Sequence, residues 1–347
     1  MEWSPEIYLS KWTREVQGNS TYNHQVDDWR TWRESSVIRL CKLLGGFPEH
    51  RVEMEHEVIE RVLCDGYIRQ RVVITTYAGL RMPLYVLIPD TVGRLPAIIA
   101  CHGHGYGSKE IVGLEPDGSD RNGGSGLHKD FAISLVKRGF IVAAPELLGF
   151  GDRRFPEDVI LGPKANSCFR LSAQLMMVGQ TLAGHRIYET MRVIDYLQTL
   201  SYVLPDQIGC MGISGGGLVA AFTAALDERI SASVVSGYAN TFHGSILDRN
   251  HCLDNYIPGI LLESDLPDII GLIAPRPLLI EAGNDDLVFP IASAKEAYRK
   301  LEYIYEAANA TDRLTADFFS GGHEISGARA FDWFVEQFDI RRKIKGG

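Results

Sequence analysis

The sequence predicts an α/β protein with a doubly wound, mostly parallel sheet. From Pro96 onward, short continuous apolar runs alternate with segments of helical spacing, and one apolar run breaks abruptly into a helix at a glycine-rich turn around Ser214. Continuous apolar runs are typical of strands buried on both faces, and strands joined through helices pair in parallel with helices on both sides. A chain of 347 residues suffices for one such domain and an appendage.

The strands and helices of this domain are expected in a regular order. Residues 69–76 and 81–88 flank the turn 77–80 and predict an antiparallel hairpin at the entrance of the domain, in which Pro83 indicates an edge position. Further strands are expected at 97–101, 140–145, 208–211, 230–235, 277–282 and 314–319. Helices are expected near 127–138, 172–200, 218–226 and 328–338.

Residues 1–62 are expected to form a helical N-terminal extension, and residues 63–347 the main domain. In the extension, the run 37–44 has helical spacing and ends at Gly45-Gly46, which is a typical C-cap. The extension also carries the four tryptophans Trp3, Trp12, Trp29 and Trp32. These aromatic residues favour docking of the extension onto the main domain, with a contact between two copies in a homodimer as the alternative.

Composition and charge exclude several classes of protein. The formal net charge is −9, from 35 basic and 44 acidic residues, which argues against nucleic acid and against an anionic membrane as partners. The N-terminus lacks a basic segment followed by an apolar core, and no apolar run has transmembrane length, so a cytoplasmic location is expected. The six cysteines show neither C-x-x-C nor zinc-ligand spacing, and we expect no cofactor and no metal.

The turn around Ser214 has the pattern of a nucleophile elbow, G-x-S-x-G. Gly212 and Gly216 stand two residues before and two residues after the serine, where strand and helix nearly touch. At such an elbow the serine adopts a strained backbone conformation, and its hydroxyl projects beyond the end of the strand. The pattern alone also fits an ordinary glycine-rich turn, so the interpretation depends on the partners of the serine.

An acid and a base follow Ser214 in the chain order that this motif requires. Asp286 comes soon after the strand expected at 277–282, whereas its neighbour Asp285 is assigned a solvated or turn-capping role. His323 comes four residues after the last expected strand, behind two glycines. A neutral imidazole can take the proton of an attacking serine, and a carboxylate fixes the tautomer of that imidazole. We therefore predict a catalytic triad of Ser214, Asp286 and His323.

Two backbone amides are expected to bind the oxyanion that develops during acyl transfer. One is the amide of Gly215, and the other is the amide of His104 in the glycine-rich loop 102–107. An interpretation of His102 and His104 as metal ligands is disfavoured, because the other soft ligand nearby, Cys101, belongs to a strand. A phosphate-binding loop is disfavoured since the sequence G-K-[ST] is missing.

These features together resemble the α/β-hydrolase fold, and within it the branch of dienelactone-hydrolase-like and acetyl-xylan-esterase-like proteins. The resemblance covers residues 65–340, and the segments that carry it are Leu87–Pro89, His102–Gly105, Pro145–Gly151, the elbow, Ala274–Ile280 and Gly321–Glu324. It implies a serine carboxylic-ester hydrolase that acts through an acyl-enzyme on short, acetyl-type esters of a small molecule. Dienelactone hydrolases proper carry cysteine at the elbow, and dehalogenase relatives carry aspartate, so Ser214 implies neither of these activities.

Two stretches without periodicity are expected to border the site and to shape its specificity. Loop 106–125 is polar and rich in glycine, which is typical of a mobile loop, and loop 238–258 carries His243 and His251. The same triad can cleave amides, so a peptidase or amidase is the alternative function. A non-catalytic binding protein of this fold would lack a member of the triad, and none is missing in this sequence.

Overall fold

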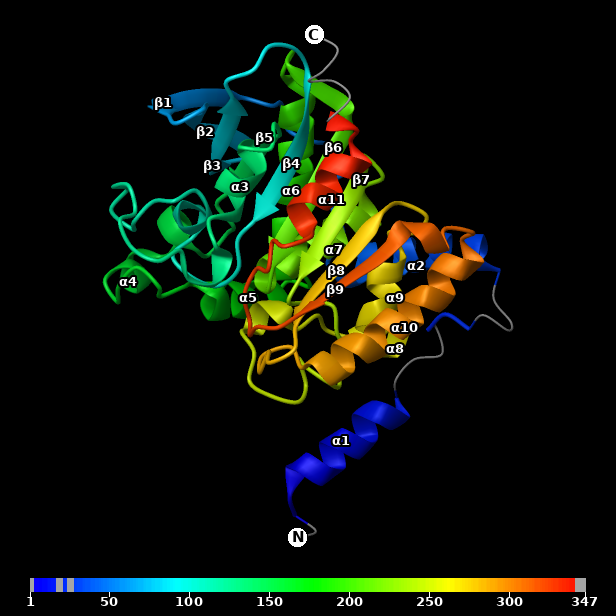
Figure 1. Ribbon diagram of the computed structural model, residues 1–347. Coiled ribbons are helices and arrows are strands. Elements are labelled where there is room, and N and C mark those ends of the chain that lie inside the picture. Colours follow the sequence, from blue (N-terminus) through cyan, green and yellow to red (C-terminus); the bar gives the residue numbers. More distant parts are fainter. Residues whose placement is uncertain (1–2, 17–20, 24–27, 341–347) are drawn as a thin grey trace.

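The computed structural model describes residues 3–16, 21–23 and 28–340, and these form an α/β structure. Nine strands of the described residues make one sheet in the order β1-β2-β3-β5-β4-β6-β7-β8-β9. Helices cover both faces of this sheet (Figure 1). The predicted fold class, a doubly wound and mostly parallel sheet, is therefore confirmed.

The first three strands form an antiparallel meander at one end of the sheet. They are β1 His56–Cys64, β2 Tyr67–Tyr77 and β3 Leu80–Pro89. The predicted hairpin is confirmed as β2 and β3, but the predicted edge position of Pro83 is wrong because β3 lies between β2 and β5. The proline fits there because β5 pairs only with Leu84–Leu87, and the Pro83 carbonyl accepts a hydrogen bond from the Glu146 amide.

The other six strands run parallel to one another, so their carboxyl ends share one edge of the sheet. They are β4 Leu95–Cys101, β5 Ile141–Pro145, β6 Val203–Ile213, β7 Ile230–Ser236, β8 Leu278–Gly283 and β9 Leu314–Phe319. The register places Cys101 beside Gly212, and Ile213 beside Ser236. Ligands of open α/β sheets bind at this edge. The arrowhead of β4 points toward it in Figure 1.

Different helices close the apolar core on each face of the sheet. On one face, α3 (Phe131–Val136) and α11 (Ala330–Gln337) bury their aromatic side chains in a common core. On the other face lie α6 (Leu182–Thr199), α7 (Gly215–Leu226) and α9 (Leu266–Gly271). The remaining helices of the main domain are α4 Pro156–Val159, α5 Cys168–Met176, α8 Ile260–Glu263 and α10 Ile291–Ala307.

The single helix predicted at 172–200 is two helices, α5 and α6. The chain turns between them at Gly179, which has a φ of 72°. A new helix then begins at Thr181, whose hydroxyl accepts a hydrogen bond of 2.9 Å from the Gly184 amide. The sequence did not reveal this boundary, because the apolar residues have helical spacing on both sides of the short break.

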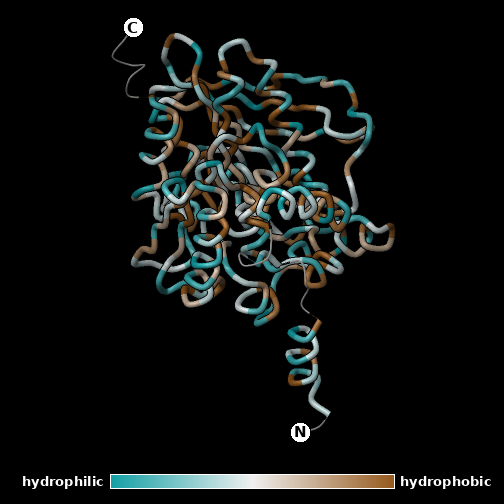
Figure 2. The backbone as a smooth tube through the Cα atoms, turned by 90° about the vertical axis from the view of Figure 1, so that its right-hand side faces the viewer, coloured by the Kyte–Doolittle hydropathy of each residue, from teal (hydrophilic) through white to brown (hydrophobic). Residues whose placement is uncertain are grey.

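Within residues 1–62 the structure has two helices and the larger part of β1. α2 (Trp29–Leu43) docks on the main domain through buried Trp32 and Leu40, and ends at the predicted cap, where the Gly46 amide bonds to the Cys41 carbonyl. α1 (Pro5–Glu15) has no buried residue and projects from the body (Figures 1 and 2). The expectation that residues 1–62 are helical is wrong for residues 56–62, which belong to β1. The division of the chain at residue 62 and the homodimer stay predictions.

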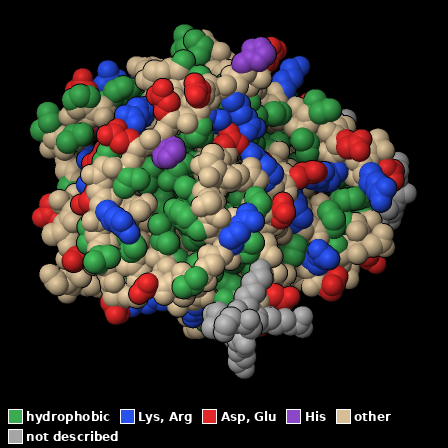
Figure 3. Space-filling model, turned by 90° about the horizontal axis from the view of Figure 1, so that it is seen from above, with side chains coloured by type: hydrophobic (Ala, Val, Ile, Leu, Met, Phe, Trp, Pro, Cys, Tyr) green, Lys and Arg blue, Asp and Glu red, His purple; other side chains and the backbone are tan. Residues whose placement is uncertain are grey.

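The face of the molecule seen from above Figure 1 carries acidic and basic side chains side by side around apolar patches (Figure 3). Neither sign of charge dominates this face, as is usual for the surface of a globular protein. Among the helices of the described ranges, none has the length and the apolar character needed to cross a membrane.

Candidate active site

Ser214 occupies the sharp turn between β6 and α7. Its backbone has φ 56° and ψ −127°, a conformation that is strained for any residue except glycine. The Ser214 amide donates a 3.0 Å hydrogen bond to the carbonyl of Ser236 at the end of β7, and its carbonyl accepts from the amide of Leu218 in α7. These bonds hold the strained turn at the carboxyl edge of the sheet. The conformation is the one expected of a nucleophile elbow.

The two glycines of the motif are required because backbone segments meet around the turn. A Cβ atom on Gly212 would lie 2.1 Å from the carbonyl oxygen of Gly216. A Cβ atom on Gly216 would lie 2.2 Å from the carbonyl oxygen of Cys101 and 2.4 Å from that of His102. The elbow is therefore pressed against the end of β4, where the predicted oxyanion loop begins.

Asp286 and His323 are brought together by the loops after β8 and β9. His323 Nδ1 lies 2.8 Å from Asp286 Oδ2, and only 16% of the His323 side chain and 1% of the Asp286 side chain are exposed. The other oxygen of Asp286 accepts hydrogen bonds of 2.7 and 2.8 Å from the amides of Val288 and Phe289. Both oxygens of this carboxylate are thus used to fix the imidazole and the loop.

Competing effects act on the pKa of Asp286. Burial raises it, but the hydrogen bond and the charge of His323, together with the two amide donors, outweigh burial and lower the pKa below its usual value of 3.8. The ionised carboxylate is consequently favoured in the folded protein. Its contribution to stability is present above the unfolded-state pKa and is lost as the pH falls through the lower folded-state pKa.

Gly237 places the imidazole of His323 beside the elbow. This glycine follows Ser236, to which Ser214 is hydrogen-bonded, and a Cβ atom on it would lie 3.2 Å from Nδ1 and Cε1 of His323. Its φ of 51° also favours glycine. The ring of Phe289 stacks on His323 at a centroid distance of 5.6 Å. The three predicted triad residues therefore lie at the same edge of the sheet, at the carboxyl ends of β6, β8 and β9.

The loop after β4 places its backbone next to the elbow. A Cβ atom on Gly215 would lie 3.3 Å from the imidazole of His104, and one on Gly103 would lie 3.2 Å from Cβ of Ser214. Within the described ranges, the amides of Gly215 and His104 donate no hydrogen bond to another protein group. Two amide donors without an internal partner beside a serine hydroxyl are what an oxyanion hole requires.

Buried histidines hold this oxyanion loop in place. The ring of His102 accepts from the Leu147 amide through Nε2 and therefore donates from Nδ1 to the Gly103 carbonyl, at 3.1 and 2.8 Å. Burial lowers the pKa of His102 to about 3, which keeps this imidazole neutral. The Gly103 amide donates to Nε2 of buried His128 at 2.9 Å, and Nδ1 of His128 lies 3.3 Å from Glu110.

Sequence reasoning missed His128, Glu110, Gly237 and Phe289. None of them belongs to a motif, and each reaches the site through tertiary packing. The one signal in the sequence was the position of Gly237 two residues after the strand expected at 230–235, where a backbone turn is expected.

The first half of loop 106–125 and parts of loop 238–258 are packed into the body. In loop 106–125, the 3-10 helix Ser108–Ile111 is mostly buried, and Arg121 donates to the hydroxyl of Tyr106, so the first half differs from the mobile loop that was expected. In loop 238–258, His251 packs on Phe289 at a centroid distance of 5.2 Å. Since Phe289 stacks on His323, the second loop borders the predicted base.

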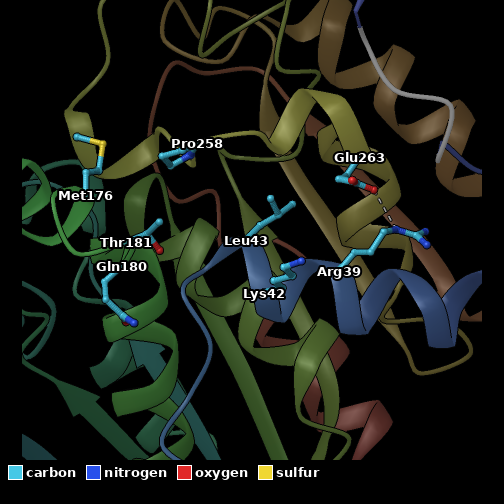
Figure 4. A pocket seen from close by; sticks show the side chains of 9 residues that line it. Arg39, Lys42, Leu43, Met176, Gln180, Thr181, Pro258 and Glu263 are labelled. Atoms are coloured by element: carbon cyan, nitrogen blue, oxygen red, sulfur yellow. Dashed lines mark ion pairs between the residues drawn. The ribbon is translucent and has the colours of Figure 1, made fainter.

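A separate hollow of about 380 Å³ lies between α2, the connection from α5 to α6, and Pro258 (Figure 4). It is lined by Arg39, Lys42, Leu43, Met176, Gly179, Gln180, Thr181, Pro258 and Glu263. Two of these lining residues, Arg39 and Glu263, form an ion pair at 3.2 Å. None of the predicted site residues lines this hollow, so it is distinct from the site at the elbow.

The sheet order and the elbow at its carboxyl edge define an α/β-hydrolase. The profile of the Abhydrolase family matches residues 10–309, and the chain belongs to this family. The resemblance found in the sequence is therefore confirmed, and the chain is a hydrolase.

A relative found by sequence and two solved structures with similar folds agree with this assignment. "Putative hydrolase YtaP" of Bacillus subtilis (strain 168) is 29% identical over 302 residues, which cover 82% of this chain and 92% of that protein. A crystal structure described as a "putative acetyl xylan esterase" from Bacteroides fragilis NCTC 9343 superposes with a TM-score of 0.77 at 20% identity, over 91% of this chain and 82% of the other. A glucuronoyl esterase from Solibacter usitatus gives 0.67 at 15% identity, over 90% and 94%.

Substitution of Gly216 tests the crowding at the elbow. We expect Gly216→Ala to lower the free energy of unfolding by more than about 2 kcal/mol, because the carbonyls of Cys101 and His102 cannot move away from a new methyl group. A loss of stability would be diagnostic, since alanine in place of glycine normally stabilises a helix. The matched control is Gly124→Ala, which meets no atom within 4 Å. Urea unfolding followed by circular dichroism should separate the two variants, and equal stabilities would contradict the packing described.

Substitution of the two neighbouring aspartates tests which carboxylate acts on His323. We expect Asp286→Asn to lower kcat/KM for a chromogenic ester by roughly 10³- to 10⁴-fold, because the amide no longer stabilises the imidazolium. Asp285→Asn should stay within about twofold of the wild type, because this side chain is exposed. A larger loss for Asp285→Asn than for Asp286→Asn would reverse the assignment.

Proposed function

We propose that this hydrolase is a serine carboxylesterase that acts through an acyl-enzyme on short, acetyl-type esters. The observation that carries the proposal is the 2.8 Å hydrogen bond between Asp286 and His323 beside a serine in a strained elbow. A serine is a weak nucleophile at neutral pH and depends on such a base. The roles proposed are nucleophile for Ser214, general base and acid for His323, and orienting carboxylate for Asp286.

Acylation begins when Ser214 Oγ attacks the ester carbonyl. Nε2 of His323 takes the hydroxyl proton, and Asp286 stabilises the imidazolium that forms while it holds the proton on Nδ1. The carbonyl oxygen becomes an oxyanion, which accepts hydrogen bonds from the amides of His104 and Gly215. The tetrahedral intermediate then collapses, the imidazolium gives its proton to the departing alcohol, and the acyl group remains on Ser214.

Deacylation repeats the same proton transfers with water as the nucleophile. His323 takes a proton from water as the water oxygen attacks the acyl carbon, and the oxyanion forms again in the same place. Collapse of this second intermediate breaks the bond to Ser214 Oγ, which recovers its proton from His323. The carboxylic acid is released and the enzyme returns to its starting state.

The similar proteins support ester substrates. The structures that superpose on the chain include a "putative acetyl xylan esterase", glucuronoyl esterases and a methylesterase. Loop 106–125 is partly buried near the site, which is consistent with a small acyl pocket. The same triad can also hydrolyse amides, so the test below includes an amide substrate.

Replacement of the nucleophile together with a series of esters tests this function. We expect the wild type to hydrolyse p-nitrophenyl acetate with a kcat/KM at least about tenfold above that for p-nitrophenyl octanoate. Ser214→Ala should reduce kcat by a factor of roughly 10³ or more, since it removes the atom that becomes acylated. Circular dichroism should show that the variant is folded.

Three outcomes would count against the proposal. Full activity of Ser214→Ala would remove this residue as the nucleophile. Faster cleavage of the octanoate than of the acetate would contradict the preference for short acyl groups. Hydrolysis of aminoacyl p-nitroanilides without hydrolysis of the esters would favour a peptidase. Ser172→Ala, at a buried position in α5, serves as a control for the serine-to-alanine change.

A further inference from the structure

Four potential metal ligands converge next to the oxyanion loop. His104 belongs to this loop, Cys168 is the first residue of α5, and Cys252 and Asp254 belong to loop 238–258. The ligand atoms of these four side chains all lie within 4.8 Å of one another. Two sulfurs, one imidazole nitrogen and one carboxylate oxygen make a ligand set of the kind that binds zinc in a tetrahedral arrangement. The mechanism proposed above uses none of these side chains.

The imidazole of His104 points into the cluster. Its Nδ1 and Cε1 edge lies against the elbow, while Nε2 is buried and has no hydrogen-bond partner among the described residues. Nε2 is 3.7 Å from Asp254 Oδ2, too far for a good hydrogen bond. Two ligands of one tetrahedral zinc ion lie about 3.4 Å apart, given bond lengths of about 2.0–2.1 Å. The position of Nε2 therefore suits a shared metal better than a direct bond.

The ligands are oriented by a second layer of hydrogen bonds. Arg186 is buried and donates to Oδ2 of Asp254 and, at 3.1 Å, to Sγ of Cys168. The other oxygen of Asp254 accepts from Asn255 at 2.8 Å. Such outer contacts are typical of metal sites, where they fix the ligand geometry.

The formal charges of the cluster balance with a divalent ion. Two thiolates and one carboxylate carry three negative charges, which a divalent ion and the guanidinium of Arg186 neutralise. A buried site with excess charge would be costly, so this balance matters for stability. Calcium and magnesium are disfavoured because both prefer oxygen ligands.

We propose that His104, Cys168, Cys252 and Asp254 bind one zinc ion. The ion ties α5 and loop 238–258 to the oxyanion loop, and so fixes the amide of His104 next to Ser214. The site differs from the H-x-H pair considered in the sequence, because both ring nitrogens of His102 are used in contacts with the protein backbone. The other ligands are far from His104 in sequence, so no ligand spacing pointed to them.

Metal analysis of the full-length protein tests the proposal. After incubation with zinc chloride and removal of free metal, we expect about one zinc ion per chain in the wild type and less than about one tenth of that in Cys168→Ser and Cys252→Ser. Cys64→Ser is the matched control, since Cys64 lies in β1 outside the cluster, and it should retain the full content. Circular dichroism should establish that each variant is folded.

Two measurements on the wild type cover the case in which a variant does not fold. Bound zinc should protect Cys168 and Cys252 from alkylation by N-ethylmaleimide at least about tenfold relative to protein treated with a chelator, while labelling of Cys64 stays unchanged. Cobalt in place of zinc should give the charge-transfer absorption of a thiolate–cobalt bond.

The proposal is overturned by any of three results. One is a wild type that, after incubation with zinc, binds less than about a tenth of an ion per chain. Another is a zinc content that the Cys168→Ser, Cys252→Ser double variant leaves unchanged. The third is a Cys168–Cys252 disulfide in protein kept free of oxidants, found by peptide mass spectrometry, which would make the cluster a redox pair. Because zinc content and alkylation do not depend on turnover, failure here is distinguishable from failure of the proposed ester hydrolysis.

Discussion

The crowding of three backbone segments around Ser214 is the constraint on which the rest of the site depends. The end of β6, the start of α7 and the end of β4 meet so closely that the carbonyls of Gly216, Cys101 and His102 leave no room for side chains at two positions. This contact fixes the strained conformation of Ser214 and brings the loop after β4 within reach of its hydroxyl. Strain of this kind persists only where surrounding structure over-determines the backbone.

Hydrogen bonds fix the other parts of the site in the same way as the backbone contacts fix the elbow. Both oxygens of Asp286 are occupied, one by His323 and one by two loop amides, so this carboxylate positions the imidazole and its own loop together. Buried His102 and His128 perform the same task for the oxyanion loop. The proposed zinc ion would add a third support, from the side of loop 238–258. Such fixed donors stabilise developing charge without reorganisation during the reaction.

The sequence predicted the features that local patterns determine. Apolar runs located the parallel strands, and the glycine pattern located the elbow, since close backbone approach leaves few other residues possible there. It did not predict the break at Gly179, because helical spacing continues across it, or the interior position of Pro83, because strand order is a tertiary property. The sequence also did not predict the positions of His128, Gly237 and the ligands of the proposed metal site. Packing brings these residues together from distant segments, which is again a tertiary property.

Covalent labelling by a fluorophosphonate tests the central claim, that Ser214 is an activated nucleophile, most directly. The reagent forms a stable adduct with a serine whose hydroxyl is deprotonated by a neighbouring base. We predict one label per chain, located on Ser214 by peptide mass spectrometry, with hydrolase activity lost in proportion to labelling and no label on His323→Ala. Activity that survives complete labelling, or a label on another residue, would contradict the account.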